Sequence, residues 1–296
     1  MKVFVTGASG FIGSAVVSEL INAGHQVIGL ARSKQSAQII SDLGAEVLMG
    51  NLNDLSVLKQ GVSLADGVIH AAFNHDFMKG GTSTFLDSAL MDKNAIETMG
   101  EVLLGTDKPI IVTAGMLGLP LINGVVTEES LALDSPRSSE ATALALAEKG
   151  INASVIRLAP SVHDKGDYGF VPFIISIARK NGISAFPNEG NTQWCAVHRL
   201  DAAKAFRLSL EKGGRGNLYN VSGDNGIEFK AIAELIGKEL HIPVESLSGD
   251  VLAKHFEWMA HFVTMDCPAS NIKTQEILGW FPTQIGLLED MKENYF

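Results

Sequence analysis

Three glycines near the start of the chain have a spacing that can hold a phosphate group. Gly7, Gly10 and Gly13 follow an apolar run at residues 3–5, and a helical pattern begins at Phe11. In such a turn the first glycine permits a tight bend, the second lets the backbone approach a pyrophosphate, and the third lets helix and strand pack closely. Unpaired N–H groups and the helix dipole favour the phosphate charge. We predict a nicotinamide dinucleotide on this turn, against the alternative of a turn without a ligand. The predicted contacts are Gly7, Ser9, Gly10, Phe11, Ile12 and Gly13.

A second group of residues bears on which dinucleotide is bound. The apolar run 26–30 predicts a strand, and Arg32 and Lys34 follow it without any acidic residue. At this strand end an acidic residue holds a free ribose 2′-hydroxyl, whereas an arginine accommodates a 2′-phosphate. Arg32 therefore favours NADP(H). NAD(H) stays open as the alternative, because Arg-Ser-Lys is also a common solvated turn.

Two further segments are predicted to lie along the cofactor. Each follows a predicted strand, the first at 46–49 and the second at 67–71. Ligands of parallel sheets bind at the carboxyl ends of the strands, where small residues leave room for them. The predicted contacts are Asn51 and Leu52 at the adenine, and Ala71, Ala72 and Phe73 farther along.

The order of the elements predicts the fold. Apolar runs alternate with helical patterns from the N-terminus to about residue 221. This alternation indicates an α/β protein with a Rossmann-type, doubly wound parallel sheet and right-handed crossovers. The looser pattern after Leu158 and the mostly helical stretch from Ile227 predict a smaller C-terminal substrate lobe. We expect a dinucleotide domain of residues 1–165, to which 194–225 return, and a substrate lobe of 166–193 and 226–296.

Composition excludes several classes of function. The chain of 296 residues has a formal net charge of -10 and a pI near 5.3, which argues against nucleic acid or an anionic membrane as the main partner. Cys195 and Cys267 are its only cysteines, so we predict neither a disulfide framework nor a metal site. The longest apolar run, 109–122, is too short to span a bilayer, and no signal peptide precedes the first strand. We expect a cytoplasmic protein that acts on a small molecule.

Four motifs spread along the chain form a wider pattern. They are Thr-Gly-Ala-Ser-Gly-Phe-Ile-Gly at 6–13, Val-Ile-His-Ala at 68–71, Ala-Val-His-Arg-Leu-Asp-Ala-Ala at 196–203, and Leu-Gly-Trp at 278–280 with Pro282. The pattern resembles that of the extended short-chain dehydrogenases/reductases, a superfamily of sugar-nucleotide epimerases and dihydroflavonol-type reductases. The resemblance implies a nicotinamide cofactor. Its relatives often dimerise through the long helices after the fourth and fifth strands, which makes a homodimer an expectation as well.

The resemblance breaks at the catalytic pair of that superfamily. Its members carry Tyr-x-x-x-Lys, in which the tyrosine exchanges a proton with the substrate oxygen and the lysine lowers the tyrosine pKa. Between Thr113 and Gly150 this chain has no tyrosine, and its only lysine is Lys149. Some relatives place His-x-x-x-Arg where the pair would be. Here Arg137 remains, while Leu133 occupies the histidine position.

An atypical subgroup without the pair is more similar. The matching stretches are Ala-Phe-Asn-His-Asp-Phe at 72–77, Arg-Ser-Ser-Glu at 137–140 with a shortened spacer, and the segment 161–172, which begins Ser-Val-His and ends Phe-Val-Pro. This likeness implies an aldehyde or carbonyl reductase. Carbonyl reduction needs a hydride donor and a group that stabilises or protonates the developing alkoxide.

Five residues are candidates for orienting, polarising or protonating the substrate oxygen. His75 follows the fourth strand beside Asp76, and a histidine next to a carboxylate can donate a proton near neutral pH. Arg137 could polarise the oxygen, although a guanidinium does not readily donate a proton. Thr113, on the fifth predicted strand, could orient it. The alternatives are a structural histidine, a salt bridge or cofactor contact, and an ordinary β-branched strand residue.

The other two of these five candidates come from the region after residue 158. Tyr168 lies in a glycine-rich stretch at the expected pocket rim, and its phenol could act as an acid from the opposite side. By the resemblance, His163 lies near the nicotinamide. The alternative for Tyr168 is a surface aromatic. Expected pocket walls are Phe73, Phe170, Trp194, Phe256 and Trp258.

These residues support one leading hypothesis and two alternatives. We expect an NADPH-preferring oxidoreductase that reduces the carbonyl of a small, fairly apolar aldehyde or ketone. A non-catalytic NAD(P)-binding sensor or interaction protein is the alternative from another class, because the catalytic pair is lost while the glycine turn is kept. Sugar-nucleotide epimerase or dehydratase chemistry is a third reading. It is disfavoured because the second lobe has no obvious Arg/Lys cluster for a diphosphate.

Overall fold

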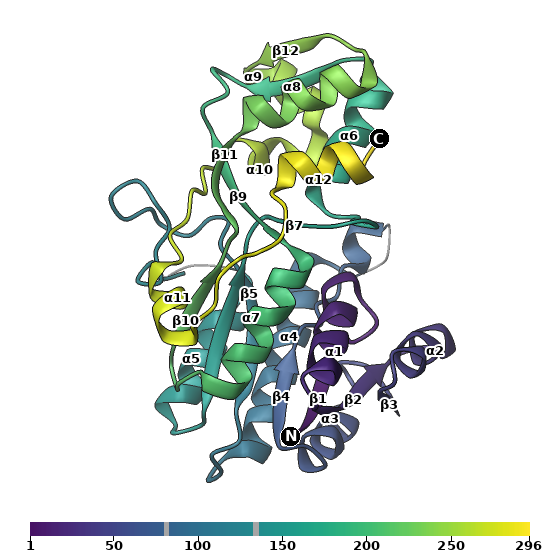
Figure 1. The fold of residues 1–296 in the computed structure, drawn as a ribbon, viewed down its shortest axis with the longest axis vertical. Coiled ribbons are helices and arrows are strands. Elements are labelled where there is room, and N and C mark those ends of the chain that lie inside the picture. Colours follow the sequence, from purple (N-terminus) through teal and green to yellow (C-terminus); the bar gives the residue numbers. More distant parts are fainter. Residues whose placement is uncertain (80–82, 133–135) are drawn as a thin grey trace.

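A computed structural model describes residues 1–79, 83–132 and 136–296 of the chain. A seven-stranded, fully parallel sheet lies at its centre, in the order β10-β6-β5-β4-β1-β2-β3 (Figure 1). Its strands are β1 (Lys2–Thr6), β2 (Gln26–Ala31), β3 (Glu46–Met49), β4 (Gly67–His70), β5 (Ile110–Gly115), β6 (Ala153–Leu158) and β10 (Leu218–Val221). The predicted Rossmann-type fold is confirmed.

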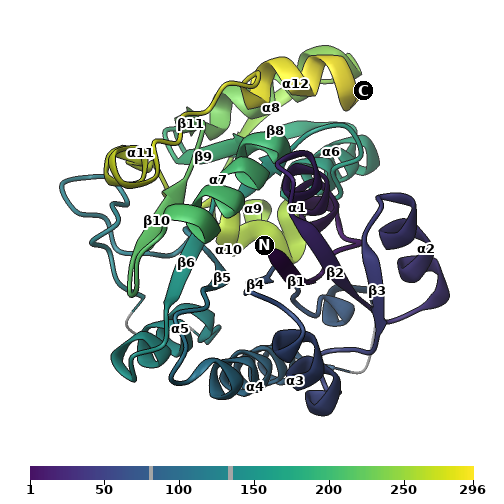
Figure 2. The same ribbon diagram turned by 60° about the horizontal axis from the view of Figure 1, so that its bottom comes forward.

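Helices cover both faces of the large sheet. In Figure 2, α3 (Leu55–Ser63), α4 (Phe85–Leu103) and α5 (Ser139–Glu148) lie on one face, and α1 (Phe11–Asn22) and α7 (Arg199–Lys212) lie on the other. Alternate residues of a strand point to opposite faces, so Phe4 enters one buried core while Val3 and Val5 enter the second. The remaining helix of this part, α2 (Lys34–Asp42), packs on β2 and β3.

The C-terminal lobe adds small sheets to its helices. One sheet has the order β11-β9-β7 and the other pairs β12 with β8. The lobe strands are β7 (Ser161–His163), β8 (Ser184–Pro187), β9 (Gln193–His198), β11 (Asp224–Glu228) and β12 (Val244–Leu247). The later helices are α6 (Phe170–Asn181), α8 (Phe229–Leu240), α9 (Gly249–Phe256), α10 (Ala260–Val263), α11 (Ile272–Leu278) and α12 (Leu287–Asn294), with short 3₁₀ turns at Asp76–Lys79 and Glu257–Met259. β10 completes the large sheet, whereas β9 pairs in a small one, and the domain boundaries stay a prediction.

A buried ion pair sets the position of α5. Arg157 of β6 donates to both carboxylate oxygens of Glu140 at 2.6 Å, and it also donates to the carbonyls of Thr127 and Ser130. Burying a charge is costly unless it is paired and hydrogen-bonded, and here both conditions are met. The first turn of α5 is therefore held against β6.

None of the helices in the described part of the chain combines the length and the apolar character that a membrane span needs.

Candidate functional site

The glycine turn forms a cradle at the junction of β1, α1 and β4. Gly7 has φ +73°, and a Cβ there would lie 2.8 Å from the backbone of Ala71 and Ala72. A Cβ at Gly13 would lie 2.0 Å from the carbonyl oxygen of Gly7. Only glycine fits both positions. From β1 the sheet extends through β2 and β3 on one side, and through β4, β5 and β6 on the other. The strand order therefore reverses between β1 and β4, and ligands of doubly wound folds bind at such a reversal.

The space over the turn fits a pyrophosphate. Gly10 precedes α1 without a side-chain cap, so the first helical N–H groups are left for a ligand or solvent. Among described atoms within 4 Å, a Cβ at Gly10 would meet the Gly7 carbonyl oxygen alone, at 3.2 Å. The predicted contacts Ser9, Phe11 and Ile12 belong to the same turn and the first residues of α1.

Residues predicted at the adenosine end lie beyond β2 and β3. Arg32 is well exposed and its Nη1 lies 3.7 Å from Oδ1 of Asp76. Ser33 caps α2 by accepting from the backbone N–H of Ser36. Asn51 donates to Asp54 through both its backbone and its side-chain nitrogen, at 2.9 and 2.7 Å. Leu52 is buried next to it.

A chain of buried hydrogen bonds starts at the carboxyl ends of β1 and β4. Thr6 and His70 are register partners there, and Thr6 Oγ1 lies 2.8 Å from His70 Nδ1. His70 Nε2 lies 3.0 Å from Oδ1 of Asp92 on α4. Ser139, the first residue of α5, donates to Oδ2 of Asp92 at 2.5 Å. Its hydroxyl oxygen in turn accepts from Nε of Arg137 at 2.9 Å.

The electrostatic environment favours opposite charges on Asp92 and Arg137, the last two ionisable groups of this hydrogen-bonded series. Burial opposes ionisation of Asp92, but the hydrogen bond and electrostatic attraction of His70, the Arg137 charge and the Ser139 hydrogen bond outweigh it and lower the Asp92 pKa. Burial lowers the pKa of the Arg137 guanidinium, and the Asp92 charge opposes that shift. Arginine has such a high intrinsic pKa that it stays a cation.

Arg137 and two other predicted residues meet at this edge of the sheet. An Nη of Arg137 donates to the carbonyl oxygen of Thr113 at 3.0 Å, and its guanidinium lies 4.2 Å from the ring centre of Phe73. The ring of Phe73 lies 5.2 Å from that of the exposed His75. The structure therefore brings Arg137, Phe73, His75 and Thr113 together. Leu133 lies outside the described residues.

The hydroxyl of Thr113 does not have the role expected from the sequence. It donates to the carbonyl oxygen of His70 at 2.8 Å. A hydroxyl has one proton, so Thr113 in this arrangement has none to give to a substrate oxygen. It instead ties the ends of β4 and β5 together beneath Arg137.

His163 has its contacts elsewhere, in the C-terminal lobe. This ring is fully buried, its Nδ1 lies 2.8 Å from Asp290 of α12, and it packs edge-on against His198. Burial lowers the His163 pKa, against the opposing attraction of Asp290. Its position near the nicotinamide stays a prediction.

Tyr168 lies over the glycine turn rather than beside Arg137. It is 70% exposed, and its ring meets the ring of Phe11 edge-on at 6.0 Å. The guanidinium of Arg199 also packs on Phe11, at 4.7 Å, and Arg199 is paired with Asp164 at 2.9 Å. The loop of Tyr168 thus contacts the start of α1, where a pyrophosphate is expected.

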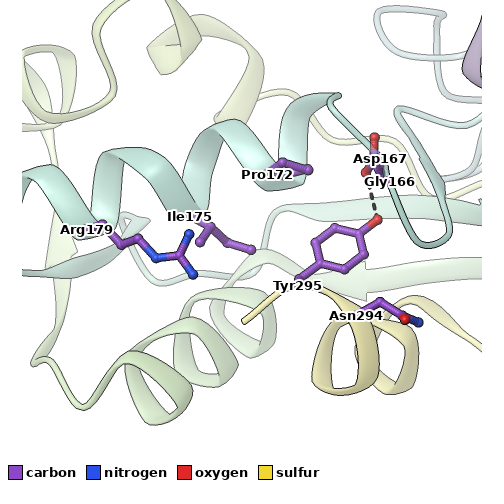
Figure 3. A pocket seen from close by; sticks show the side chains of 7 residues that line it. All are labelled: Gly166, Asp167, Pro172, Ile175, Arg179, Asn294 and Tyr295. Atoms are coloured by element: carbon purple, nitrogen blue, oxygen red, sulfur yellow. Dashed lines mark hydrogen bonds between the residues drawn. The ribbon is translucent and has the colours of Figure 1, made fainter.

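A small cavity of about 190 Å³ lies behind that loop (Figure 3). It separates α6 from the end of α12, and Tyr295 donates to Asp167 across it at 2.7 Å. Burial raises the pKa of both groups. Two of the expected pocket walls, Trp194 and Phe256, are fully buried in the core of the lobe, so they cannot line an open pocket. Phe170 and Trp258 keep some exposure.

Comparison with known proteins places the chain in a family. The model of the NAD dependent epimerase/dehydratase family matches residues 3–105. The uncharacterized protein YLL056C of Saccharomyces cerevisiae is 46% identical over 300 residues, which cover 100% of this chain and 99% of the yeast protein. The chain belongs to the NAD-dependent epimerase/dehydratase family.

Other proteins are similar to this chain at lower identity. A 4-hydroxy-2-methyl-3-oxo-4-farnesyl-3,4-dihydroquinoline-1-oxide ketoreductase from Stigmatella aurantiaca is 24% identical over 249 residues, covering 80% of this chain and 72% of that protein. The fold matches a dTDP-glucose 4,6-dehydratase from Streptomyces venezuelae, solved with NAD bound, at a TM-score of 0.76 and 18% identity over 99% of this chain and 98% of that one.

Family membership and the glycine cradle agree about the cofactor. Membership of this family supports an oxidoreductase or epimerase-type enzyme with a nicotinamide cofactor, and the family model covers the glycine turn. The residues that would hold it are those of the glycine turn and the neighbouring ends of β2, β3 and β4.

Sequence reasoning missed four polar residues of this family member's site. Thr6 and His70 stand inside the recognised motifs, at register positions that would have suggested their pairing. Asp92 and Ser139 lie in helices that meet only in the folded chain, and they carry no local motif. One usable signal was Asp92, a carboxylate on the buried side of a long helix, because a buried charge is costly unless it is paired and hydrogen-bonded.

Proposed function

We propose that the protein is an NADPH-dependent carbonyl reductase in which Arg137 stabilises the developing alkoxide. The observation that carries the proposal is the fixed guanidinium at the carboxyl edge of β5, bonded to Thr113 and Ser139 and stacked on Phe73. The ketoreductase name of the Stigmatella aurantiaca relative supports this reaction class. A fixed cation is worth most where oxygen gains negative charge in the transition state.

The bound nicotinamide would supply a hydride to the carbonyl carbon of a small, fairly apolar aldehyde or ketone. Arg137 would bind the carbonyl oxygen and hold the charge that develops on it. Phe73 would support the guanidinium and form an apolar wall. Because an arginine does not readily donate a proton, the alkoxide would take its proton from the exposed His75 or from water.

The 2′-phosphate preference rests on the residues after β2. Arg32 and Lys34 bring positive charge, and the N-terminus of α2 lies at Ser33 between them. Both a guanidinium and a helix N-terminus favour a phosphate. Asp76 neutralises part of this charge, but the Arg32–Asp76 pair is exposed and long at 3.7 Å, so Arg32 is easily redirected to a ligand.

Turnover decides between this function and a sensor without catalysis. Purified protein is mixed with NADPH and a panel of aldehydes and ketones, and loss of absorbance of the reduced cofactor is followed. We expect turnover of at least one apolar carbonyl compound, and kcat/KM should fall by about 100-fold or more in Arg137→Met. The exposed Arg215 gives the matched control, Arg215→Met, which should keep the wild-type rate. NADPH binding without turnover on the whole panel would refute the reductase proposal.

A further inference from the structure

The Ser139 hydroxyl bridges two groups of opposite charge. It donates to Oδ2 of the fully buried Asp92 at 2.5 Å and accepts from Nε of Arg137 at 2.9 Å. Asp92 and Arg137 come from different places in the sequence, and they attract each other although they do not touch directly. The first residue of α5 therefore places a hydroxyl between a carboxylate on α4 and a guanidinium just before α5.

Every polar group of this network has a partner. An ionised Asp92 can only accept, so His70 donates to it from Nε2. The other ring nitrogen, Nδ1, lies 2.8 Å from the hydroxyl of Thr6, whose oxygen takes the backbone N–H of Ala72 at 3.3 Å. Asp92 and Arg137 carry opposite charges, and both are hydrogen-bonded to Ser139. A buried charge without a partner would be strongly unfavourable.

The far side of Arg137 is held as well. Its Nη donates to the Thr113 carbonyl, and its face packs on Phe73. The Thr113 hydroxyl donates to the carbonyl of His70, which closes the network on itself. Removing the Asp92 charge would therefore loosen one of the restraints that keep the guanidinium at the sheet edge.

We propose that Asp92 is a positioning residue that, through the Ser139 hydroxyl, balances the Arg137 charge and keeps the guanidinium where a substrate oxygen would bind. This inference rests on the proposed function for what Arg137 does, but the charge pairing itself does not. Asp92 touches neither substrate nor cofactor in this account and acts through Arg137. The ligand selected by such a site is a carbonyl compound whose oxygen becomes negative.

A thermal double-mutant cycle tests the pairing without any substrate. Asp92→Asn should lower the unfolding midpoint of the wild-type protein by roughly 5 °C or more, since it leaves the Arg137 charge unbalanced. In Arg137→Met the same change should be neutral or should raise the midpoint, because the Asp92 carboxylate then no longer has the Arg137 charge to balance. A midpoint loss of equal size in both backgrounds would overturn the pairing.

Kinetics test the positioning role. Asp92→Asn and the milder Ser139→Ala should each lower kcat for the carbonyl substrate by about 10-fold or more, with the KM for NADPH within about threefold of wild type. Adding Asp92→Asn to Arg137→Met should cost no further activity. The control is Glu97→Gln on the same helix, whose carboxylate is half-exposed and 3.9 Å from Lys93; it should change neither readout.

The outcomes separate the two proposals. If the wild-type protein turns over no carbonyl compound, the proposed function fails while the thermal cycle still decides whether Asp92 balances Arg137. If the protein is a reductase and the rate losses of Asp92→Asn and Arg137→Met multiply in the double variant, Asp92 does not act through Arg137 and the positioning role is refuted. Ser139→Ala keeps this test usable where Asp92→Asn does not fold.

Discussion

Arg137 shows how a single residue gains its place from neighbours that are distant in the sequence. The chain resembles reductases in its motifs, yet it has no tyrosine between Thr113 and Gly150 to act as their acid. The structure puts a guanidinium at the carboxyl edge of β5, in contact with Thr113 and Phe73. Stabilising an alkoxide and protonating it are then separate tasks. Arg137 can perform the first, and His75 or water must perform the second.

A residue-scale prediction concerns cofactor choice. Arg32→Ala should raise the dissociation constant for NADPH about 10-fold or more, because it removes a charge-assisted hydrogen bond to the 2′-phosphate. Binding of NADH, which has no such phosphate, should change by less than about threefold, corresponding to roughly 0.65 kcal/mol. Titration of intrinsic or cofactor fluorescence measures both constants. Equal weakening of the two cofactors would contradict the assignment of Arg32 to the 2′-phosphate.

Residue types predict the glycine turn, because only glycine tolerates the close approaches at Gly7 and Gly13. The surroundings of His163 could not be predicted, because a short strand, β7, carries it into contact with Asp290, 127 residues farther along the chain. No local pattern announces such a contact.

Elements of the large sheet follow their sequence patterns more closely than those of the lobe. Buried strands such as β2 and β5 carry apolar runs, at residues 27–31 and 110–112, which are typical of parallel sheets covered on both faces. The lobe strands β7, β8, β11 and β12 have three to five residues each, and several are half-exposed or polar. Their pairing partners lie far away in the chain, so periodicity could not reveal them.

One element-scale prediction concerns the anchoring of α12 under acid conditions. Burial lowers the His163 pKa in the folded protein below its ordinary value of 6.5. The folded protein therefore binds fewer protons than the unfolded chain between the two pKa values, and acid favours unfolding. The His163 contribution to stability is complete above about pH 6.5 and is lost as the pH falls toward the lowered folded value.

The test compares the unfolding midpoints of the wild type and His163→Asn at about pH 7.5 and about pH 5. These two values lie on either side of the ordinary histidine pKa of about 6.5. The wild type should lose stability on acidification, and His163→Asn should lose less over the same interval. His255 has a pKa lowered by burial too and supplies a residual slope in both proteins. Identical slopes for the two proteins would contradict a titrating His163.

On the scale of the whole molecule, the parallel sheet separates two buried cores, and one of them continues into the lobe. The lobe lies at one end of the large sheet (Figure 1). The lobe meets the cofactor domain at several points, among them Tyr168 on Phe11 and the backbone N–H of Thr283 on the carboxylate of Asp201 in α7. Cys195 and Cys267 are buried free thiols, and the fold brings their sulfur atoms within 3.9 Å. Their nearness depends on the tertiary fold and could not be inferred from their separation in sequence.

The central claim is that the glycine turn holds a nicotinamide whose hydride passes to a carbonyl carbon at the Arg137 edge of the sheet. The most direct measurement uses NADPH carrying deuterium at C4 of the nicotinamide, with an accepted carbonyl substrate, and mass spectrometry of the alcohol product. When the deuterium lies on the face of the ring from which the enzyme takes the hydride, we predict an alcohol with one deuterium on the former carbonyl carbon. Arg137→Met should form this labelled alcohol far more slowly. An alcohol without deuterium from both C4-labelled forms of the cofactor, or no alcohol at all, would contradict it.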